Sequence, residues 1–141
     1  MTTENQVLDA QALRELAQRR SPKACQCSLG ACEGWESVSG DRWPEGAVEK
    51  LGSLRATLDA NGAPLPEPSF AEFHPAGTRY ESPEAPIAPL FFPYNRCDVF
   101  ACGQCDRVLL QYTEFGGYYV DHRVRALNPE RVTDAPLPDA D

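Results

Sequence analysis

The sequence predicts a small α+β protein in which two helices pack with an antiparallel sheet. Three observations lead to this fold class: two windows with apolar residues at helical spacing, a hairpin pattern near the C-terminus, and a long proline-rich stretch between them. The 141 residues are enough for one domain with a modest core. We expect this domain to span residues 1–127, followed by a frayed, acidic, proline-containing tail over 128–141.

The first helix is expected from Asn5 to Arg20. Thr3 and Gln6 have the spacing of a capping box, in which each side chain satisfies a backbone N–H of the first turn. Pro22 ends the helix, because proline cannot continue it. The apolar residues at helical spacing are Leu8, Ala12, Leu13, Leu16 and Ala17.

A second helix is expected from Pro44 to about Ala60. Proline is favoured at the first helical position, and Asn61-Gly62 supplies a stop signal. The apolar stripe of this helix would consist of Val48, Leu51, Leu54 and Leu58.

The stretch from Pro64 to Pro93 holds eight of the thirteen prolines, which excludes a long helix. Disordered linkers are poor in aromatic residues, and this stretch and its border are rich in them. We therefore expect an ordered, irregular segment over the core, with short strands near Ser69–His74 and Leu90–Arg96. The aromatic residues are Phe70, Phe73, Phe91, Phe92 and Tyr94.

Two β-rich runs, Arg107–Phe115 and Tyr118–Arg125, flank Gly116-Gly117 and predict a hairpin with a two-residue turn. Counting back from this turn places Thr113 opposite Val120.

Side chains alternate across a strand, so the hairpin has two faces. The mostly apolar face is expected to pack, and it carries His122 opposite Gln111. The mixed face is expected to meet solvent or a partner. Its candidate interaction residues are Tyr112, Tyr119, Asp121, Arg123 and Arg125.

Cys102 and Cys105 are separated by two residues on a turn that contains Gly103, so both thiolates can bind one cation. A Cys-x-x-Cys turn followed at once by a hairpin resembles the core of zinc ribbons and zinc knuckles. The resemblance covers residues 102–127 and implies a zinc-stapled fold, with no activity of its own.

A structural zinc ion needs four ligands, and the other cysteine cluster can supply the remaining two. Cys25 and Cys27 are the expected second pair, while Cys32 and Cys97 are further possible ligands or small buried residues. Four thiolates leave no position open for water, so this Zn²⁺ would be structural and its binding would be part of folding.

The cysteines have two alternative uses, an iron–sulfur cluster and a redox dithiol. Cys97, Cys102 and Cys105 have the spacing of the first three ligands of a plant-type [2Fe–2S] ferredoxin, but no fourth cysteine follows them. A redox dithiol usually lies at a helix N-terminus, whereas a strand is expected after Cys105.

The net charge of the chain and its expected compartment limit the classes of binding partner. A net charge of −8 and a sequence pI near 4.7 argue against nonspecific nucleic-acid binding and permit a basic protein partner. The sequence has no apolar run of the roughly twenty residues that span a bilayer, and no secretory signal. We therefore expect a bacterial cytoplasmic protein with reduced cysteines.

Three functional classes remain, and the first is a zinc-stabilised protein-interaction module. Its concrete form is an immunity-type protein whose acidic surface covers a basic toxin. The second is a nucleic-acid-associated zinc ribbon that uses a basic and aromatic strip. The third is an enzyme or a thiol redox protein. The strip of the second class would comprise Arg96, Arg107, Tyr112, Tyr119, Arg123 and Arg125.

No known catalytic motif is present, so we expect a binding protein and assign no catalytic residue. His122 is expected to be a hydrogen-bonded packing residue on the apolar face of the hairpin. His74 precedes Pro75 in the irregular segment and has no obvious partner in the sequence.

Overall fold

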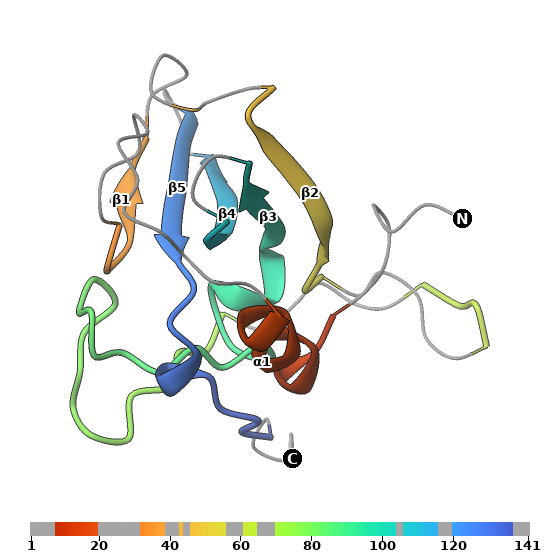
Figure 1. The fold of residues 1–141 in the computed structure, drawn as a ribbon. Coiled ribbons are helices and arrows are strands. Elements are labelled where there is room, and N and C mark those ends of the chain that lie inside the picture. The colour runs from red at the N-terminus through yellow and green to blue at the C-terminus, as the bar shows by residue number, and fades with distance from the viewer. Residues whose placement is uncertain are drawn as a thin grey trace.

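The computed structural model describes residues 8–19, 32–38, 43, 46–55, 61–64, 70–103, 106–115 and 120–136. These residues form a five-stranded antiparallel sheet in the order β1-β5-β4-β3-β2, with helix α1 near one end of it (Figure 1). The elements are α1 (Ala10–Arg19), β1 (Glu36–Ser37), β2 (Val48–Ser53), η1 (Tyr94–Arg96), β3 (Asp98–Cys102), β4 (Val108–Phe115), β5 (Val120–Ala126) and η2 (Pro129–Arg131).

The predicted fold class, with two helices and a sheet, is wrong: the described part of the chain is mostly β and has one α-helix. Val48–Ser53, expected within the second helix, forms strand β2 and pairs with β3. Residues three apart share one side of a helix but lie on opposite faces of a strand. Val48 and Leu51 pack in different cores on the two faces, so both are partly buried without a helix.

The predicted first helix is confirmed over Ala10–Arg19 and begins later than expected. The Asp9 side chain accepts a hydrogen bond from the Ala12 N–H at 2.8 Å, which is an N-cap interaction. Leu8, before this cap, donates its N–H to the Ser53 carbonyl at 2.7 Å. The expected capping box of Thr3 and Gln6 lies outside the described residues.

The hairpin of β4 and β5 forms, but its pairing differs from the prediction by two residues. Thr113 lies opposite His122, and Gln111 lies opposite Val124. Because a strand alternates with a period of two, this shift changes the partners and leaves the predicted members of each face the same.

Both faces of the sheet are covered in part. The larger core joins the mixed face of the hairpin to α1 and the irregular segment, and the smaller core lies on the other face. The mixed face was expected to meet solvent or a partner, so its burial is a correction. The larger core includes Leu13, Trp35, Ile87, Tyr94, Val99, Leu110 and Tyr112, and the smaller consists of Cys32, Val38, Leu109 and Val124 with partly buried neighbours.

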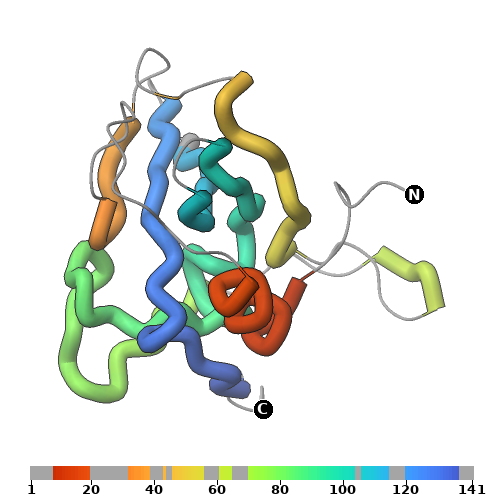
Figure 2. The backbone as a smooth tube through the Cα atoms, viewed as in Figure 1, coloured from red at the N-terminus to blue at the C-terminus, as the bar shows by residue number. Residues whose placement is uncertain are grey.

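The irregular segment is ordered in its described part, residues 70–97, and packs on the core. Figure 2 shows its green portion looping below β1 and β5. Ile87, Phe91 and Tyr94 are buried. The strands expected near Ser69–His74 and Leu90–Arg96 are absent from the described residues, where turns and the 3-10 helix η1 are found instead.

The segment after Leu127 is packed over its first residues, contrary to the expectation of a frayed tail. Ile87 donates its N–H to the Arg131 carbonyl at 2.8 Å and accepts from the Thr133 N–H at 3.0 Å. Arg14 of α1 donates to the Val132 carbonyl at 2.9 Å, and the Val132 side chain is buried. The packed structure therefore continues to Thr133.

No helix in the described ranges is long and apolar enough to cross a membrane.

Candidate functional site

Cys102 is the last residue of β3 and begins the turn to β4. Its N–H donates to the Arg107 carbonyl at 2.9 Å, and its carbonyl accepts from the Asp106 N–H at 2.9 Å. The Cys102 side chain is buried. The Cys-x-x-Cys stretch thus begins at the turn directly before the hairpin, as predicted, and the added finding is that strand β3 leads into it. Cys105, Cys25 and Cys27 lie outside the described residues.

Cys32 and Cys97, the further possible ligands, lie in different cores. Cys32 belongs to the smaller core, and its carbonyl accepts from the Ala126 N–H at 2.8 Å. Cys97 belongs to the larger core and donates its S–H to the Pro93 carbonyl at 3.3 Å. Burial, reinforced by Asp98, raises the pKa of the Cys97 thiol well above its usual value. Cys97 is therefore a protonated packing residue in this structure.

Within the described residues, no group of three or more His, Cys, Asp or Glu side chains is placed to hold a metal ion. Three of the four predicted ligands lie outside those residues, so the zinc site stays a prediction.

The candidate interaction residues separate into buried and surface members. Tyr112 is 3% exposed and Arg125 is fully buried. Asp121 and Arg123 are partly exposed at the outer end of the same face. Tyr119 lies outside the described residues.

Arg125 crosses from β5 to the irregular segment and makes three hydrogen bonds to uncharged acceptors. Nη1 donates to the Tyr94 hydroxyl, and Nη2 donates to the carbonyls of Pro83 and Ala85, each at 2.9 Å. Its guanidinium carbon also lies 5.9 Å from the centre of the Tyr94 ring. This side chain thereby fixes the loop around Pro83 to the sheet.

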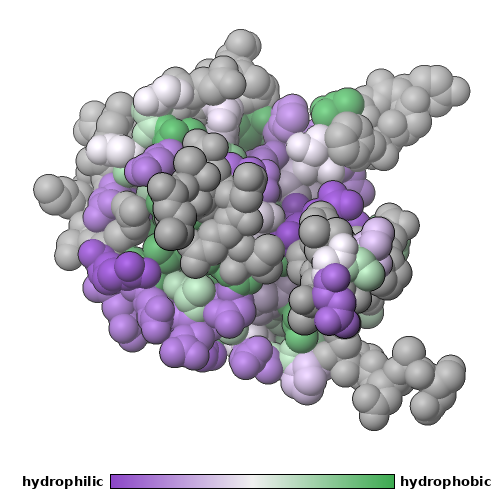
Figure 3. Space-filling view, turned by 90° about the vertical axis from the view of Figure 1, so that its right-hand side faces the viewer, coloured by the Kyte–Doolittle hydropathy of each residue, from purple (hydrophilic) through white to green (hydrophobic). Residues whose placement is uncertain are grey.

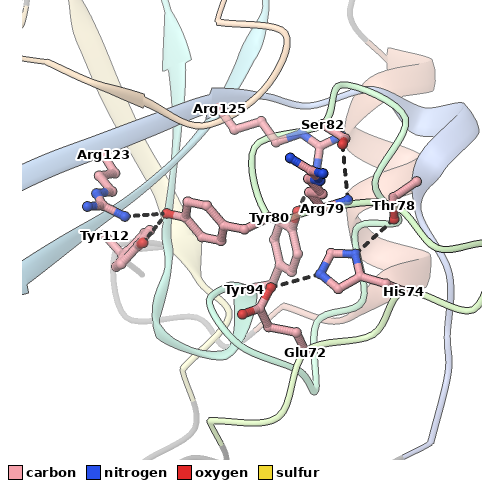
Figure 4. Close-up of polar contacts among 10 residues, drawn as sticks. All are labelled: Glu72, His74, Thr78, Arg79, Tyr80, Ser82, Tyr94, Tyr112, Arg123 and Arg125. Carbon is pink, nitrogen blue, oxygen red and sulfur yellow. Dashed lines mark hydrogen bonds and ion pairs between the residues drawn. The ribbon is translucent and has the colours of Figure 1, made fainter.

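Arg123 ends a chain of polar contacts that runs inward from the surface (Figure 4). Its Nε donates to Asp121 at 2.9 Å and its Nη1 donates to the Tyr80 hydroxyl at 3.1 Å. The Tyr80 and Tyr112 hydroxyls are hydrogen-bonded to each other. Ser37 of β1 donates to the same Asp121 oxygen at 2.9 Å. Strands β1, β4 and β5 and the irregular segment are tied together at this point.

The charges at this cluster follow from its surroundings. Burial raises the pKa of both tyrosines, and for Tyr112 the hydrogen bond with Tyr80 raises it further, so both are neutral phenols. Burial alone would raise the pKa of Asp121, but hydrogen bonds from Arg123 and Ser37 lower it below its ordinary value. The cluster holds the ion pair of Asp121 with Arg123, the two protonated phenols and the Ser37 hydroxyl.

A second polar cluster lies in the irregular segment and was missed in the sequence. His74 Nε2 lies 2.8 Å from the Glu72 carboxylate, and His74 Nδ1 lies 2.8 Å from the Thr78 hydroxyl (Figure 4). The alternation of Glu72, Phe73 and His74 could have predicted the first contact, because residues two apart in extended chain share a side. Thr78 depends on the turn that follows, in which the Gly77 N–H donates to the His74 carbonyl at 3.1 Å.

The other histidine is placed differently from the prediction. His122 is exposed, not packed, and its Nδ1 lies 3.2 Å from the Thr113 hydroxyl across the hairpin.

Comparisons of this chain with protein-family models, with curated proteins and with solved structures found no match.

Proposed function

We propose that the chain is a zinc-stapled protein-interaction module of the bacterial cytoplasm whose acidic surface binds a basic protein. A protein that covers a basic toxin, as immunity proteins do, is the concrete form of this proposal. The observation that carries it is the distribution of charge between the surface and the interior.

Exposed acids outnumber exposed cations two to one in the described part of the chain. Arg125 is buried, and the partly exposed cations are matched in number by partly exposed acids. The partly exposed cations are Lys50, Arg96, Arg107 and Arg123, and the acids are Asp98, Asp106, Glu114 and Asp121. The exposed acids are Asp9, Glu15, Glu33, Glu36, Glu49, Glu72, Glu81, Glu84, Glu130 and Asp134. The exposed cations are Arg14, Arg19, Arg55, Arg79 and Arg131.

A surface of this kind attracts a positively charged partner and speeds its association. Figure 3 views the molecule from the β2 side, and hydrophilic side chains gather over the lower part of that face. The basic strip considered for nucleic-acid binding has lost two members to the interior, since Tyr112 and Arg125 are buried. The charge distribution therefore favours a protein partner over nucleic acid.

The sheet supports the zinc part of the proposal through the positions of Cys32 and Cys102. Cys102 and Phe100 are two residues apart on β3, so their side chains lie on the same face of the sheet. Phe100 packs on the smaller core, which contains Cys32. Cys32 lies next to β5 on the side away from β4, so three strand spacings, about 14 Å, separate it from β3. Cys102 lies two residues, about 7 Å, further along β3, so the direct distance is about 16 Å. The five residues from Cys27 to Cys32 can span at most about 17 Å. The predicted ligand Cys27 is thus within reach of Cys102.

The zinc part is tested by elemental analysis of untagged protein purified without a chelator. We expect one zinc per chain, and Cys102→Ser should lose the metal together with most of the unfolding free energy. Cys97→Ser is the matched control, because this buried thiol belongs to the other core and should leave the zinc content unchanged. A metal-free parent with normal stability would contradict the zinc staple.

The partner is tested by affinity purification from the native host, followed by reconstitution from purified components. We expect a basic protein in one-to-one ratio, with affinity that falls as salt rises. Reversal of two exposed acids in one loop, Glu81→Lys with Glu84→Lys, should weaken binding mainly through the association rate. Reversal of two exposed cations, Arg79→Glu with Arg131→Glu, is the control and should not weaken it. Equal affinity of both double variants would contradict the proposal.

A further inference from the structure

The loop that carries Glu72, His74 and Thr78 is attached firmly to the core. Phe73, between the first two residues, packs on Phe91 with the ring centres 5.0 Å apart. The Ala71 carbonyl, directly before Glu72, accepts from the Phe92 N–H at 2.8 Å. These contacts place Glu72 and His74 on the side away from Phe73, where both are partly exposed.

The His74 imidazole lies between a carboxylate and a hydroxyl, at 2.8 Å from each. The Glu72 carboxylate can only accept from Nε2, so it holds the neutral ring in the tautomer with the proton on Nε2. Nδ1 is then an acceptor, and the Thr78 hydroxyl donates to it. A nucleophile within hydrogen-bond reach of a base, with that base oriented by a third group, is the arrangement of covalent catalysis.

We propose that Thr78 is a nucleophile for small uncharged esters, with His74 as its general base and Glu72 as the positioning residue. Thr78 is partly exposed, and its contact with His74 is part-buried. The Glu72 charge beside the ring disfavours anionic esters and stabilises the imidazolium that forms during the attack. The activity goes beyond the proposed binding function, and neither zinc nor a partner takes part in the reaction.

The chemistry is balanced without a cofactor. Thr78 Oγ1 attacks the ester carbonyl as its proton moves to His74 Nδ1, and a tetrahedral intermediate forms. The intermediate collapses, the C–O bond to the alcohol breaks, and the alcohol leaves with the proton from His74. Water then attacks the acyl-threonine, with His74 again taking and returning a proton. The products are one acid and one alcohol, and Thr78 is restored.

The chain contains a matched control in Thr113 and His122. The Thr113 hydroxyl lies 3.2 Å from His122 Nδ1, at an exposed position across the hairpin. No hydrogen bond joins a carboxylate to the other nitrogen of this ring among the described contacts. The two pairs share their residue types and differ in the orienting acid and in the length of the contact.

The test uses p-nitrophenyl acetate with the full-length protein, and follows p-nitrophenol release together with the intact mass. We expect an initial burst and the mass of one acetyl group, located at Thr78 by peptide mapping. Thr78→Val, which removes the hydroxyl at similar size, should abolish both. Thr113→Val should leave both unchanged. His74→Gln should slow acylation about 100-fold or more, the usual contribution of a general base.

The remaining variants separate positioning from simple stability. Glu72→Gln should lower the maximal acylation rate without changing the ester concentration that gives half of it. Thr78→Ser should still be acetylated at position 78, which guards against loss of folding in Thr78→Val. Acetyl groups found on lysine, on the N-terminus or on His74 itself would overturn the proposal. So would equal bursts from the parent and from folded Thr78→Val.

Discussion

Arg123 and Arg125 lie on the same face of β5, two residues apart, yet they have opposite surroundings. Arg125 is fully buried and donates only to uncharged oxygens, from Tyr94, Pro83 and Ala85. Arg123 is partly exposed and donates to the Asp121 carboxylate as well as to Tyr80.

The difference shows that position along one strand decides whether an arginine is buried against uncharged oxygens or forms an ion pair at the surface. Burying a guanidinium is costly unless most of its donors are paired. Oxygens of the irregular segment pair both Nη groups of Arg125, while its Nε has no hydrogen-bond partner among the described residues. An arginine at the end of the face keeps access to water, so a weak surface ion pair is enough to satisfy it. We therefore expect Arg125 to support the fold and Arg123 to contribute little to it.

The largest effect is expected from Arg125→Met, which keeps an unbranched side chain out to about the Nε position and removes the guanidinium and its charge. The buried acceptors on Tyr94 and Ala85 lose their donor, each at a cost of about 1–3 kcal/mol, and the part-buried Pro83 carbonyl can turn to water, so the loss of unfolding free energy should be about 2–6 kcal/mol. Urea unfolding measures it. Arg125→Lys should fall between Met and the parent, because lysine cannot reproduce the fork of donors. A parent-like midpoint for Arg125→Met would mean that these contacts do not hold the loop.

Gly34→Ala should cause the next largest loss of unfolding free energy, because it displaces the loop that Arg125 holds. An added Cβ would lie 2.2 Å from the Glu81 carbonyl oxygen, so backbone must move. Overpacking of this kind costs about 1–3 kcal/mol. Glu33→Ala, at the exposed neighbouring residue, should change the stability by less than about 0.5 kcal/mol in the same urea titration. Equal midpoints for the two variants would show that the loops separate easily.

Tyr112→Phe tests the inner end of the polar chain that begins at Arg123. Loss of one hydroxyl hydrogen bond should cost about 1 kcal/mol at neutral pH. The folded protein holds the pKa of Tyr112 above its ordinary value of 10.0, so above that pH the unfolded chain releases the proton first and stability falls. Denaturant titrations from pH 8 to about pH 11 should show a shallower alkaline loss for the variant. Parallel curves would exclude this linkage.

Asp121→Asn should have the smallest effect, about 0.5 kcal/mol, since exposed ion pairs are weak. The lowered pKa of Asp121 means that its contribution is present above the ordinary value of 3.8 and is lost as the pH falls through the lower folded value. The difference from the parent should therefore shrink in acid and in high salt. A loss as large as that of Arg125→Met would remove the distinction between the two arginines.

The sequence predicted the hairpin and the first helix because each rests on contacts within a short stretch. The second helix was wrong because Val48 and Leu51 are both partly buried, and a sheet covered on both faces produces the same spacing as a helix. Gly52 was the available warning, since glycine weakens a helix by about 1 kcal/mol relative to alanine.

The candidate site was harder to predict, because its partners come from distant parts of the chain. The sequence correctly placed Arg123 and Arg125 on one face. The carbonyl oxygens that accept hydrogen bonds from Arg125 belong to a segment about forty residues earlier, whose sequence has no helical or strand periodicity. Alternation of side chains along an extended chain could have predicted the contact of Glu72 with His74. The contact of His74 with Thr78 could not be predicted in this way, because it depends on the turn at Gly77. The zinc ligands stay a prediction that only metal analysis will test.

The bonds of Ile87 to Arg131 and Thr133 have a practical consequence for mapping partners with shortened chains. A fragment that stops at Leu127 would remove both backbone partners of Ile87 and the carbonyl that Arg14 binds. It would also uncover the fully buried Ile87 side chain. Such a fragment would lose binding if it misfolded, and its newly exposed apolar surface would favour nonspecific association with other proteins. Deletion series should therefore end no earlier than Thr133, with stability checked before affinity.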